Sequence, residues 1–297
     1  MAISTLNEAG QPARWTAIVL AGQRPEGDAL ATQLGVPAKA LIGIEGRSML
    51  ARVVDALLAT PEVARLLVLA QQPDVIANGE PSDILNDGRV TLAASGNGIA
   101  ASIALAIDKS EVSWPVLVTT ADNALLTSER VSALLREARG IDLALGVGER
   151  SIVEAVFPDT KRSWLKFADG HFSGANLFAL AHPRCLPILR HWQAIEQDRK
   201  KGLKLFASFG PILFLQMLTR TIALQHAVTQ VSAKMGFTAK AVILDAEAPI
   251  DVDKIEDLVL VKRILARRLE GRGSDVSIPA GQQDAFDAAP DRSERQE

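Results

Sequence analysis

Residues 16–21, TAIVLA, form an apolar, strand-like run that leads through a long loop, Gly22 to Ala38, into Lys39 and the segment ALIGIEGRSML at 40–50. A buried strand that ends at a glycine and continues into a loop with Arg and Lys is typical of open α/β sheets, which present backbone N–H groups and cations to phosphate. This stretch therefore predicts a protein that handles a nucleotide.

A P-loop is the first alternative for this loop, because Gly22 and Gly27 have the G-x-x-x-x-G spacing of that motif. However, Asp28 and Ala29 stand where a P-loop needs the Lys and the Ser or Thr that contact phosphate and magnesium. A carboxylate at that position would repel phosphate. The sequence therefore excludes a P-loop.

A dinucleotide fingerprint is the second alternative, since GNGIAA at 96–101 matches the G-x-G-x-x-A variant. Dinucleotide folds place this fingerprint at their first strand-to-helix turn, whereas here it falls far into the predicted sheet. No acidic residue follows at a strand end about 20 residues later. A dinucleotide-dependent oxidoreductase is therefore the weaker alternative among enzymes.

Composition narrows the remaining classes. The 297 residues are 48% hydrophobic, which suffices for one large core, and the formal net charge is only −3. Basic residues do not alternate with aromatic ones along a stripe, so no nucleic-acid partner is expected. Cys185 is the sole cysteine, which excludes a disulfide framework within one chain. No apolar run reaches the length of a transmembrane helix, and we expect a cytoplasmic protein.

The hydrophobic pattern predicts an α/β fold, because strand-like and helix-like runs alternate. Strands are expected at 15–21, 64–70, 89–93, 114–120 and 142–147, and the clearest helices at 49–59, 99–108 and 128–138. Such alternation predicts a mostly parallel sheet covered on both faces. After residue 150, SIVEAVFP at 151–158 and the run at 164–180 indicate short antiparallel strands with a turn at Asp169 and Gly170. The sheet is therefore expected to be mixed.

The same pattern gives the organisation of the chain. We expect an N-terminal arm at 1–14 and one domain at 15–270, within which 183–235 is largely helical. A last strand at 241–245 and a long helix from about 254 to 270 close this domain. Residues 271–297 are rich in Gly, Ser, Pro, Gln and charge, which predicts a disordered tail.

Six landmarks in a fixed order resemble one enzyme family. They are IVLAG at 18–22 with Arg24, Lys39 with LIGIEGRSML, SGNGIAASI at 95–103, PVLVTTAD at 115–122, SGANLFAL at 173–180 and PIDVDKIEDL at 249–258. This order resembles the nucleotidyltransferases related to molybdenum-cofactor guanylyl- and cytidylyltransferases and to methylerythritol-phosphate cytidylyltransferase.

The resemblance implies a glycosyltransferase-A-like fold, a three-layer α/β structure whose mostly parallel mixed sheet has helices on both faces. It implies a magnesium-dependent enzyme that couples a nucleoside triphosphate, CTP or GTP, to a small phosphorylated acceptor and releases pyrophosphate. Such chemistry needs carboxylates for Mg²⁺ and cations for the triphosphate.

Two carboxylates are the candidate metal ligands. Asp122 ends the most apolar strand, and so would stand at the carboxyl edge of the sheet, where open α/β folds bind ligands. From local sequence alone it is equally a turn residue. The resemblance assigns Mg²⁺ to Asp122 and Asp253, with Asp251 as the substitute if the register differs. Asp253 with Glu256 also forms a capping-box pattern for the closing helix.

The resemblance assigns the remaining roles as well. Lys39, Arg24 and Asp122 are the catalytic candidates, and the nucleotide-binding candidates are Ala21, Gly22, Arg24, Lys39, Gly96 and Ser102. Ser173, Gly174 and Asn176 are the candidates for binding the acceptor, although such small residues at a strand start also form bulges. Gly96 and Gly98 would equally form an ordinary strand-to-helix turn.

Two further hypotheses come from local sequence. Basic residues beside an apolar run at 198–218 suggest that this segment contacts a membrane surface or a lipid-like acceptor, the alternative being a core helix with a basic edge. The unusual loop at 23–38 suggests, as an alternative function, a nucleotide-binding protein that has lost catalysis.

Overall fold

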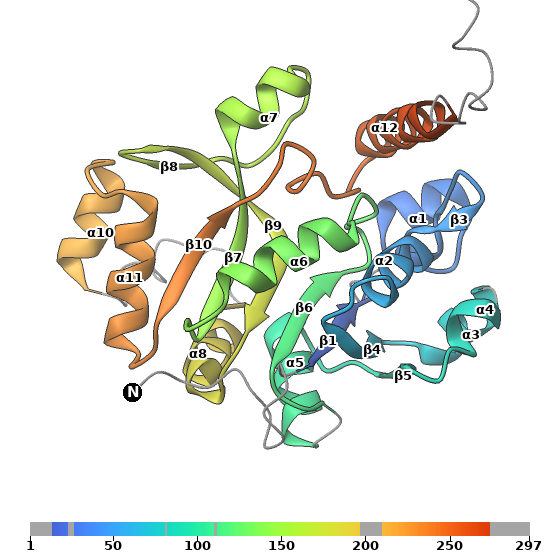
Figure 1. The fold of residues 1–297 in the computed structure, drawn as a ribbon, viewed down its shortest axis with the longest axis horizontal. Coiled ribbons are helices and arrows are strands. Elements are labelled where there is room, and N and C mark those ends of the chain that lie inside the picture. Colours follow the sequence, from blue (N-terminus) through green and yellow to red (C-terminus); the bar gives the residue numbers. More distant parts are fainter. Residues whose placement is uncertain (1–13, 23–26, 81, 110–111, 197–209, 274–297) are drawn as a thin grey trace, which may run out of the picture.

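A mixed eight-stranded sheet forms the centre of the fold (Figure 1). The computed structural model describes residues 14–22, 27–80, 82–109, 112–196 and 210–273. The strand order is β10-β7-β9-β6-β1-β4-β5, with β8 paired to β9. The strands are β1 (Trp15–Leu20), β4 (Val63–Ala70), β5 (Val90–Ala94), β6 (Val116–Thr120), β7 (Leu143–Glu149), β8 (Leu165–Phe167), β9 (Gly170–Leu180) and β10 (Ala239–Ile243).

Strand direction is parallel along β6-β1-β4-β5 and between β7 and β10, whereas β9 runs antiparallel to both β6 and β7. The parallel strands therefore end at one edge of the sheet, and the loops that follow them meet there. A separate hairpin, β2 (Gly43–Ile44) with β3 (Arg47–Ser48), follows the loop that contains Lys39.

Helices cover both faces of the sheet. One face packs against α2 (Met49–Leu58), α3 (Pro73–Gly79), α4 (Ser82–Leu85) and α6 (Ser128–Glu137). The other face packs against α5 (Ile99–Asp108) and α8 (Leu186–Glu196), and further along against α10 (Pro211–Leu218) and α11 (Leu224–Lys234). Short 3-10 turns, η1 (Lys39–Leu41) and η2 (Pro183–Cys185), complete these layers. The expected three-layer α/β class is confirmed.

Successive side chains of each central strand point to opposite faces of the sheet and so contribute to two separate cores. In β1, Ala17 and Val19 pack toward α2 and α6, whereas Ile18 between them packs toward α5 and α8. Because both faces are covered, the central strands are apolar throughout, as the sequence indicated. The five expected strands and the three clearest helices all occur within two residues of their expected bounds. The antiparallel strands around Asp169 and Gly170 are also confirmed.

The expectation for residues 151–158 was wrong. These residues lie mostly in α7 (Arg150–Val156), not in a strand. Val153 is fully buried, and Arg150 Nε donates to Glu154 Oε1 at 2.7 Å across one turn of this helix. A short run rich in Ile and Val fits either type of element by periodicity, and here one buried position and an ion pair at i,i+4 spacing favour the helix.

A third core cluster lies at the carboxyl edge of the sheet. It joins α1 (Ala29–Leu34), α7, α12 (Ile255–Gly273) and the loop after β10, which carries the buried Ile250 and Val252. In Figure 1, α12 lies beside α1 at the upper right. Since this loop carries Asp251 and Asp253, the cluster fixes the position of two candidate functional residues.

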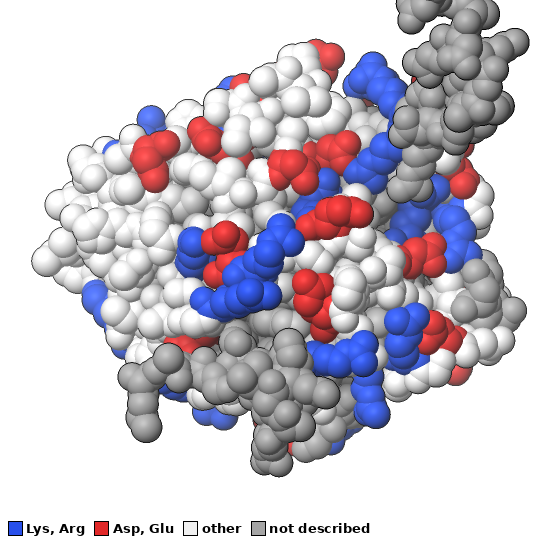
Figure 2. Space-filling model, in the orientation of Figure 1, with Lys and Arg blue, Asp and Glu red and all other residues white. Residues whose placement is uncertain are grey.

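Outside these layers, the domain limits expected from sequence stay predictions. α12 extends to Gly273, three residues past the expected limit of 270, while 1–13 and 274–297 lie outside the described residues. Of the segment 198–218, residues 198–209 also lie outside them, and residues 211–218 form α10. Among the described helices, none is long and apolar enough to cross a membrane. On the face shown in Figure 2, acidic and basic side chains are interspersed.

A buried arginine anchors the start of the loop after β10. Arg130 on α6 is 5% exposed; its Nε and Nη2 donate to both carboxylate oxygens of Asp245 at 2.8 and 2.7 Å, and its Nη1 donates to the carbonyl of Leu125 at 2.7 Å. Nη2 also donates to Glu247, which accepts a second bond from Arg268 of α12. These bonds tie α6, the loop and α12 together.

Replacing this guanidinium should destabilise the fold. We expect Arg130→Met to lower the free energy of unfolding by about 2–3 kcal/mol, because the Leu125 carbonyl and Asp245 each lose a donor. Urea unfolding followed by circular dichroism measures this loss. The control is Arg136→Met, an exposed arginine on the same helix. Equal stability of the two variants would show that Arg130 does not anchor the loop.

Candidate nucleotidyl-transfer site

Lys39, Asp122 and Asp253 meet at the carboxyl edge of the sheet. Lys39 Nζ donates to Asp122 Oδ2 at 2.8 Å and to Asp253 Oδ1 at 2.5 Å. The lysine and Asp122 side chains are 12% and 20% exposed, whereas Asp253 is 59% exposed. The structure thus brings together three of the residues that the sequence assigned to catalysis and metal binding, with one ammonium between two carboxylates.

Backbone hydrogen bonds bring these three residues from separate parts of the chain. Asp122 follows β6, which lies next to β1, and the amide of Ala121 donates to the carbonyl of Leu20 at 3.0 Å. The amide of Val252 then donates to the carbonyl of Asp122 at 3.1 Å, so the loop after β10 is fixed to the end of β6. Lys39 opens η1, whose first carbonyl accepts from Ile42.

Two glycines of β7 allow this loop to lie directly on the sheet. A Cβ atom at Gly148 would stand 2.4 Å from Cγ of Pro249, and one at Gly146 would stand 2.8 Å from Cδ1 of Leu244. Any larger residue at Gly148 would push Pro249 away. Because Asp251 and Asp253 follow Pro249 closely, the missing side chain at Gly148 contributes to the position of the carboxylates.

Electrostatics favour the charged form of Lys39. Burial alone would lower the pKa of Lys39, but the charges and hydrogen bonds of Asp122 and Asp253 outweigh it and hold the pKa well above its ordinary value. Burial, together with the nearby Asp122, raises the pKa of Asp251 to about 6, although Arg162 acts in the opposite direction. Lys39 is therefore a permanent cation at neutral pH.

Arg162 is a functional candidate that sequence reasoning missed. Its side chain is 6% exposed, and it donates to Asp251 and, at 2.7 Å, to Asp257 Oδ1. Asp257 in turn accepts from the amides of Asp253 and Lys254 at 3.1 and 3.0 Å. Arg162 comes from the irregular segment between α7 and β8, where no local pattern marks it. Its partner Asp251 was considered only as a substitute ligand.

The capping box at the N-terminus of α12 lies one residue later in the sequence than expected. The helix begins at Ile255, so Lys254 is the N-cap, and Asp257 is the residue that reaches back to it. The sequence assigned these roles to Asp253 and Glu256. Asp257 occupies the third helical position, where a carboxylate closes a capping box. Its spacing of three residues from the N-cap is the sequence signal that could have identified Asp257. Asp253 stays available for the site.

Asn176 reaches the same cluster through Asp251, since its Nδ2 donates to Asp251 Oδ2 at 2.9 Å. The residue has φ +48°, and the β7–β9 register shifts between Leu145 and Val147. Such a bulge redirects a side chain, and here it turns Asn176 toward the loop after β10. Ser173 and Gly174, the other acceptor candidates, lie on the same strand and line a cavity with Asn176.

The nucleotide-binding candidates lie at neighbouring strand ends. Ala21 and Gly22 follow β1, and a Cβ atom at Gly22 would stand 3.1 Å from Nε2 of Gln71, which follows β4. Ser102 is buried and closes the turn before α5, where its Oγ accepts from the amide of Gly96 at 3.0 Å. These turns share one edge of the sheet, since β1, β4, β5 and β6 are parallel. Arg24 lies outside the described residues.

The donor set fits a magnesium ion. Within the ranges that the structure describes, no three His, Cys, Asp or Glu side chains form a ready metal cage. Mg²⁺ does not need one, because it is commonly held by one or two carboxylates, water and substrate phosphates. Asp122 and Asp253 converge on a single cationic atom, and they are hard oxygen ligands. They would hold the ion together with the phosphates of a bound nucleotide.

The comparison with protein families agrees with this geometry. The model of the MobA-like NTP transferase domain matches residues 17–209, which is more than half of the chain. The chain belongs to this family. It is therefore a nucleotidyltransferase enzyme, as the order of the sequence landmarks indicated. Among curated protein sequences, none matches the chain.

Solved structures agree on the fold. A hypothetical transferase from Thermus thermophilus is 29% identical, with a TM-score of 0.68, 82% of this chain covered and 99% of that one. A 4-diphosphocytidyl-2C-methyl-D-erythritol synthase from Anaerococcus prevotii is 13% identical, with a TM-score of 0.53 and coverages of 86% and 97%. A CMP:2-keto-3-deoxy-manno-octonic acid synthetase complexed with CTP is 14% identical, with a TM-score of 0.53 and coverages of 86% and 99%. The expected glycosyltransferase-A-like fold is confirmed.

Removing the charge of Lys39 should affect turnover far more than folding. We expect Lys39→Met to lower the rate of pyrophosphate release by about 100-fold or more, because a cation at the phosphates stabilises transition-state charge. The unfolding midpoint should fall only modestly, since Asp253 is largely exposed and can be solvated, and Asp122 keeps its hydrogen bond from Thr120. Lys240→Met is the matched control, as this exposed lysine pairs with Glu137. Wild-type turnover in Lys39→Met would contradict the assignment.

Proposed function

We propose that this chain is a magnesium-dependent nucleotidyltransferase that couples CTP or GTP to a small phosphorylated acceptor and releases pyrophosphate. The observation that carries the proposal is the convergence of Lys39, Asp122 and Asp253 at the carboxyl edge of the sheet. Support also comes from the family and from the structural neighbour that was solved in complex with CTP. In this reaction an acceptor oxygen bonds to the α-phosphorus, and the bond from that phosphorus to the β-phosphate oxygen breaks.

The residues of this chain would divide the work as follows. The backbone at Ala21 and Gly22 and the turn at Gly96 would bind the nucleoside part, and Lys39 would compensate the charge that moves onto the departing pyrophosphate. Asp122 and Asp253 would hold Mg²⁺, which neutralises phosphate charge when it is bound. A phosphate nucleophile is already anionic and needs no protein base. Asn176, which donates to Asp251, would contact the acceptor.

The two carboxylates give the sharpest test of this division. We expect Asp122→Asn and Asp253→Asn each to lower Mg²⁺-dependent pyrophosphate release by about 100-fold or more, because the amide loses the anionic oxygen that the metal needs. The assay compares CTP, GTP, ATP and UTP with pooled phosphorylated acceptors. Asp159→Asn, at an exposed loop position, is the control. Wild-type rates in either variant would contradict the metal assignment.

The same assay separates the alternatives. Nucleotide affinity in calorimetry without pyrophosphate release from any of the four triphosphates would favour a binding protein that has lost catalysis. Saturable binding of a nicotinamide dinucleotide would favour the oxidoreductase alternative. Chelation by EDTA should abolish pyrophosphate release, and added Mg²⁺ should restore it. Release that persists after chelation would contradict the magnesium dependence.

We also propose that α10 contacts a membrane surface. This helix exposes an apolar stripe of Ile212, Leu215 and Leu218, which are 73%, 59% and 63% exposed, while Leu213 is buried in the core beneath. Few charged side chains are visible on this side of the molecule, at the left of Figure 2. An apolar helix face that follows a basic segment in sequence suits an anionic interface.

Vesicle flotation tests this contact. We expect the full chain to float with vesicles that contain anionic phospholipid. High salt should reduce the floating fraction at least fivefold, and so should the double variant Ile212→Glu with Leu215→Glu. Val259→Glu is the control, because Val259 is an equally exposed apolar residue on α12. Failure of the wild-type chain to float, or flotation that the α10 variant leaves unchanged, would contradict the proposal.

A further inference from the structure

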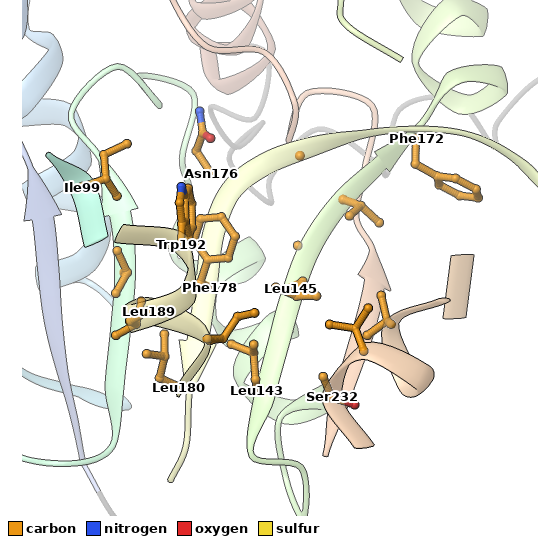
Figure 3. A pocket seen from close by; sticks show the side chains of 18 of the residues that line it. Ile99, Leu143, Leu145, Phe172, Asn176, Phe178, Leu180, Leu189, Trp192 and Ser232 are labelled. Atoms are coloured by element: carbon orange, nitrogen blue, oxygen red, sulfur yellow. The ribbon is translucent and has the colours of Figure 1, made fainter. Parts of the chain in front are cut away.

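A cavity of about 410 Å³ lies between the sheet and helices α5, α8 and α11. Its walls are almost entirely apolar, and side chains of β7, β9 and α8 such as Leu145, Phe178 and Trp192 point into it (Figure 3). Trp192 and Phe178 contact each other edge to face, with ring centroids 6.1 Å apart. The volume lies in the range that holds small ligands, roughly 300–1,000 Å³.

The few polar side chains of the cavity lie toward the catalytic cluster. Thr120 Oγ1 donates to Asp122 Oδ1, and Asn176 Nδ2 donates to Asp251 Oδ2 at 2.9 Å. In Figure 3, Asn176 lies at the upper end and Leu180 at the lower end. The cavity therefore begins one hydrogen bond away from two of the carboxylates, and it continues along the sheet into apolar surroundings.

The backbone keeps this space open. Gly174 pairs with Val147 across β7 and β9, both residues line the cavity, and a Cβ atom at Gly174 would meet no atom within 4 Å. The one hydroxyl at the far side, that of Ser232, is already bonded to the carbonyl of Thr229 at 3.1 Å. The cavity is partly open to solvent, since Ile99 and Leu165 in its lining are 38% and 54% exposed, and apolar surface left in contact with water is unfavourable. A space of this size next to a site is consequently suited to a ligand.

The walls decide which chemistry fits. A sugar or a pterin would bury hydroxyl or ring nitrogen groups against Leu143, Leu145 and Leu180 without hydrogen-bond partners, which is unfavourable. An alkyl or isoprenoid chain needs no such partners, and its burial is favoured by the hydrophobic effect. Only the end of the ligand that reaches Thr120 and Asn176 would contact polar side chains of the protein.

We propose that the acceptor is amphiphilic: a phosphate on an alkyl or isoprenoid chain of medium length, with the phosphate at the cluster of Lys39 and Asp122 and the chain in this cavity. This inference rests on the proposed function, because it places the acceptor's reacting oxygen at that cluster. On this inference the whole cavity, and not only the residues at its mouth, determines which acceptor binds.

A binding measurement without nucleotide or Mg²⁺ tests the cavity by itself. The probe is 10-bromodecyl phosphate, whose bromine quenches a tryptophan that it approaches. We expect saturable quenching of the full chain, largely lost in Trp192→Phe. Gly174→Leu and Val228→Phe, which fill the cavity from two sides, should weaken binding at least tenfold. Gly88→Leu should not, because Gly88 is exposed and equally open but lies outside the cavity.

Some results would overturn the inference. Absence of saturable quenching, or equal affinity in Gly174→Leu, Val228→Phe and the wild type, shows that no alkyl chain enters this cavity. Unchanged quenching in Trp192→Phe places the probe elsewhere.

A comparison of turnover with two acceptors tests this inference separately from the proposed function. With Mg²⁺ and CTP or GTP, we expect decyl phosphate to support at least tenfold higher kcat/KM for pyrophosphate release than ethyl phosphate. Equal values for the two acceptors leave the proposed function standing and overturn the inference. Saturable quenching without pyrophosphate release from either acceptor overturns the assigned acceptor role and counts against the proposed function, while the cavity still binds alkyl phosphates.

Discussion

The site depends on one backbone hydrogen bond, from the amide of Val252 to the carbonyl of Asp122. It joins the end of the central strand β6 to the loop after β10, two segments that are distant in sequence. It sets the position of Asp253 relative to Asp122, so that Lys39 can bond to both carboxylates. The ammonium of Lys39 then offsets the repulsion that two adjacent carboxylates would otherwise have.

Two arginines hold the same loop from opposite sides. Arg130 binds its beginning through Asp245, and Arg162 binds its end through Asp251 and Asp257. Both guanidinium groups are almost fully buried, so their bonds are less screened than surface ion pairs. A loop that is fixed at both ends can present Asp253 to solvent and substrate without losing its position. Rigid support of exposed ligands is what a nucleotidyl-transfer site needs.

Much of this arrangement could be predicted from the sequence, because strand ends obey a general rule. Parallel strands end at one edge, so the strand before Asp122 predicts its place at the carboxyl edge of the sheet, whereas the pairing with Asp253 is what the family resemblance implies. The type of element at residues 151–158 could not be predicted, because one buried valine and one ion pair favour a helix over a strand there. Arg162 could not be found, because its partners Asp251 and Asp257 are far from it in sequence. The cavity depends on the packing of α8 and α11 against β7 and β9, which no local pattern encodes.

We propose that Asp122 and Asp253 together hold a divalent cation when a nucleotide is bound, and that Lys39 then turns to the phosphates. The most direct measurement is a crystal structure of the full chain with Mn²⁺ and a non-hydrolysable analogue of CTP or GTP, with the anomalous signal of manganese recorded. We expect one anomalous peak at about 2.2 Å from oxygens of both carboxylates, with Lys39 Nζ bonded to a phosphate oxygen. A bound nucleotide with Lys39 still between the two carboxylates, and manganese elsewhere, would contradict it.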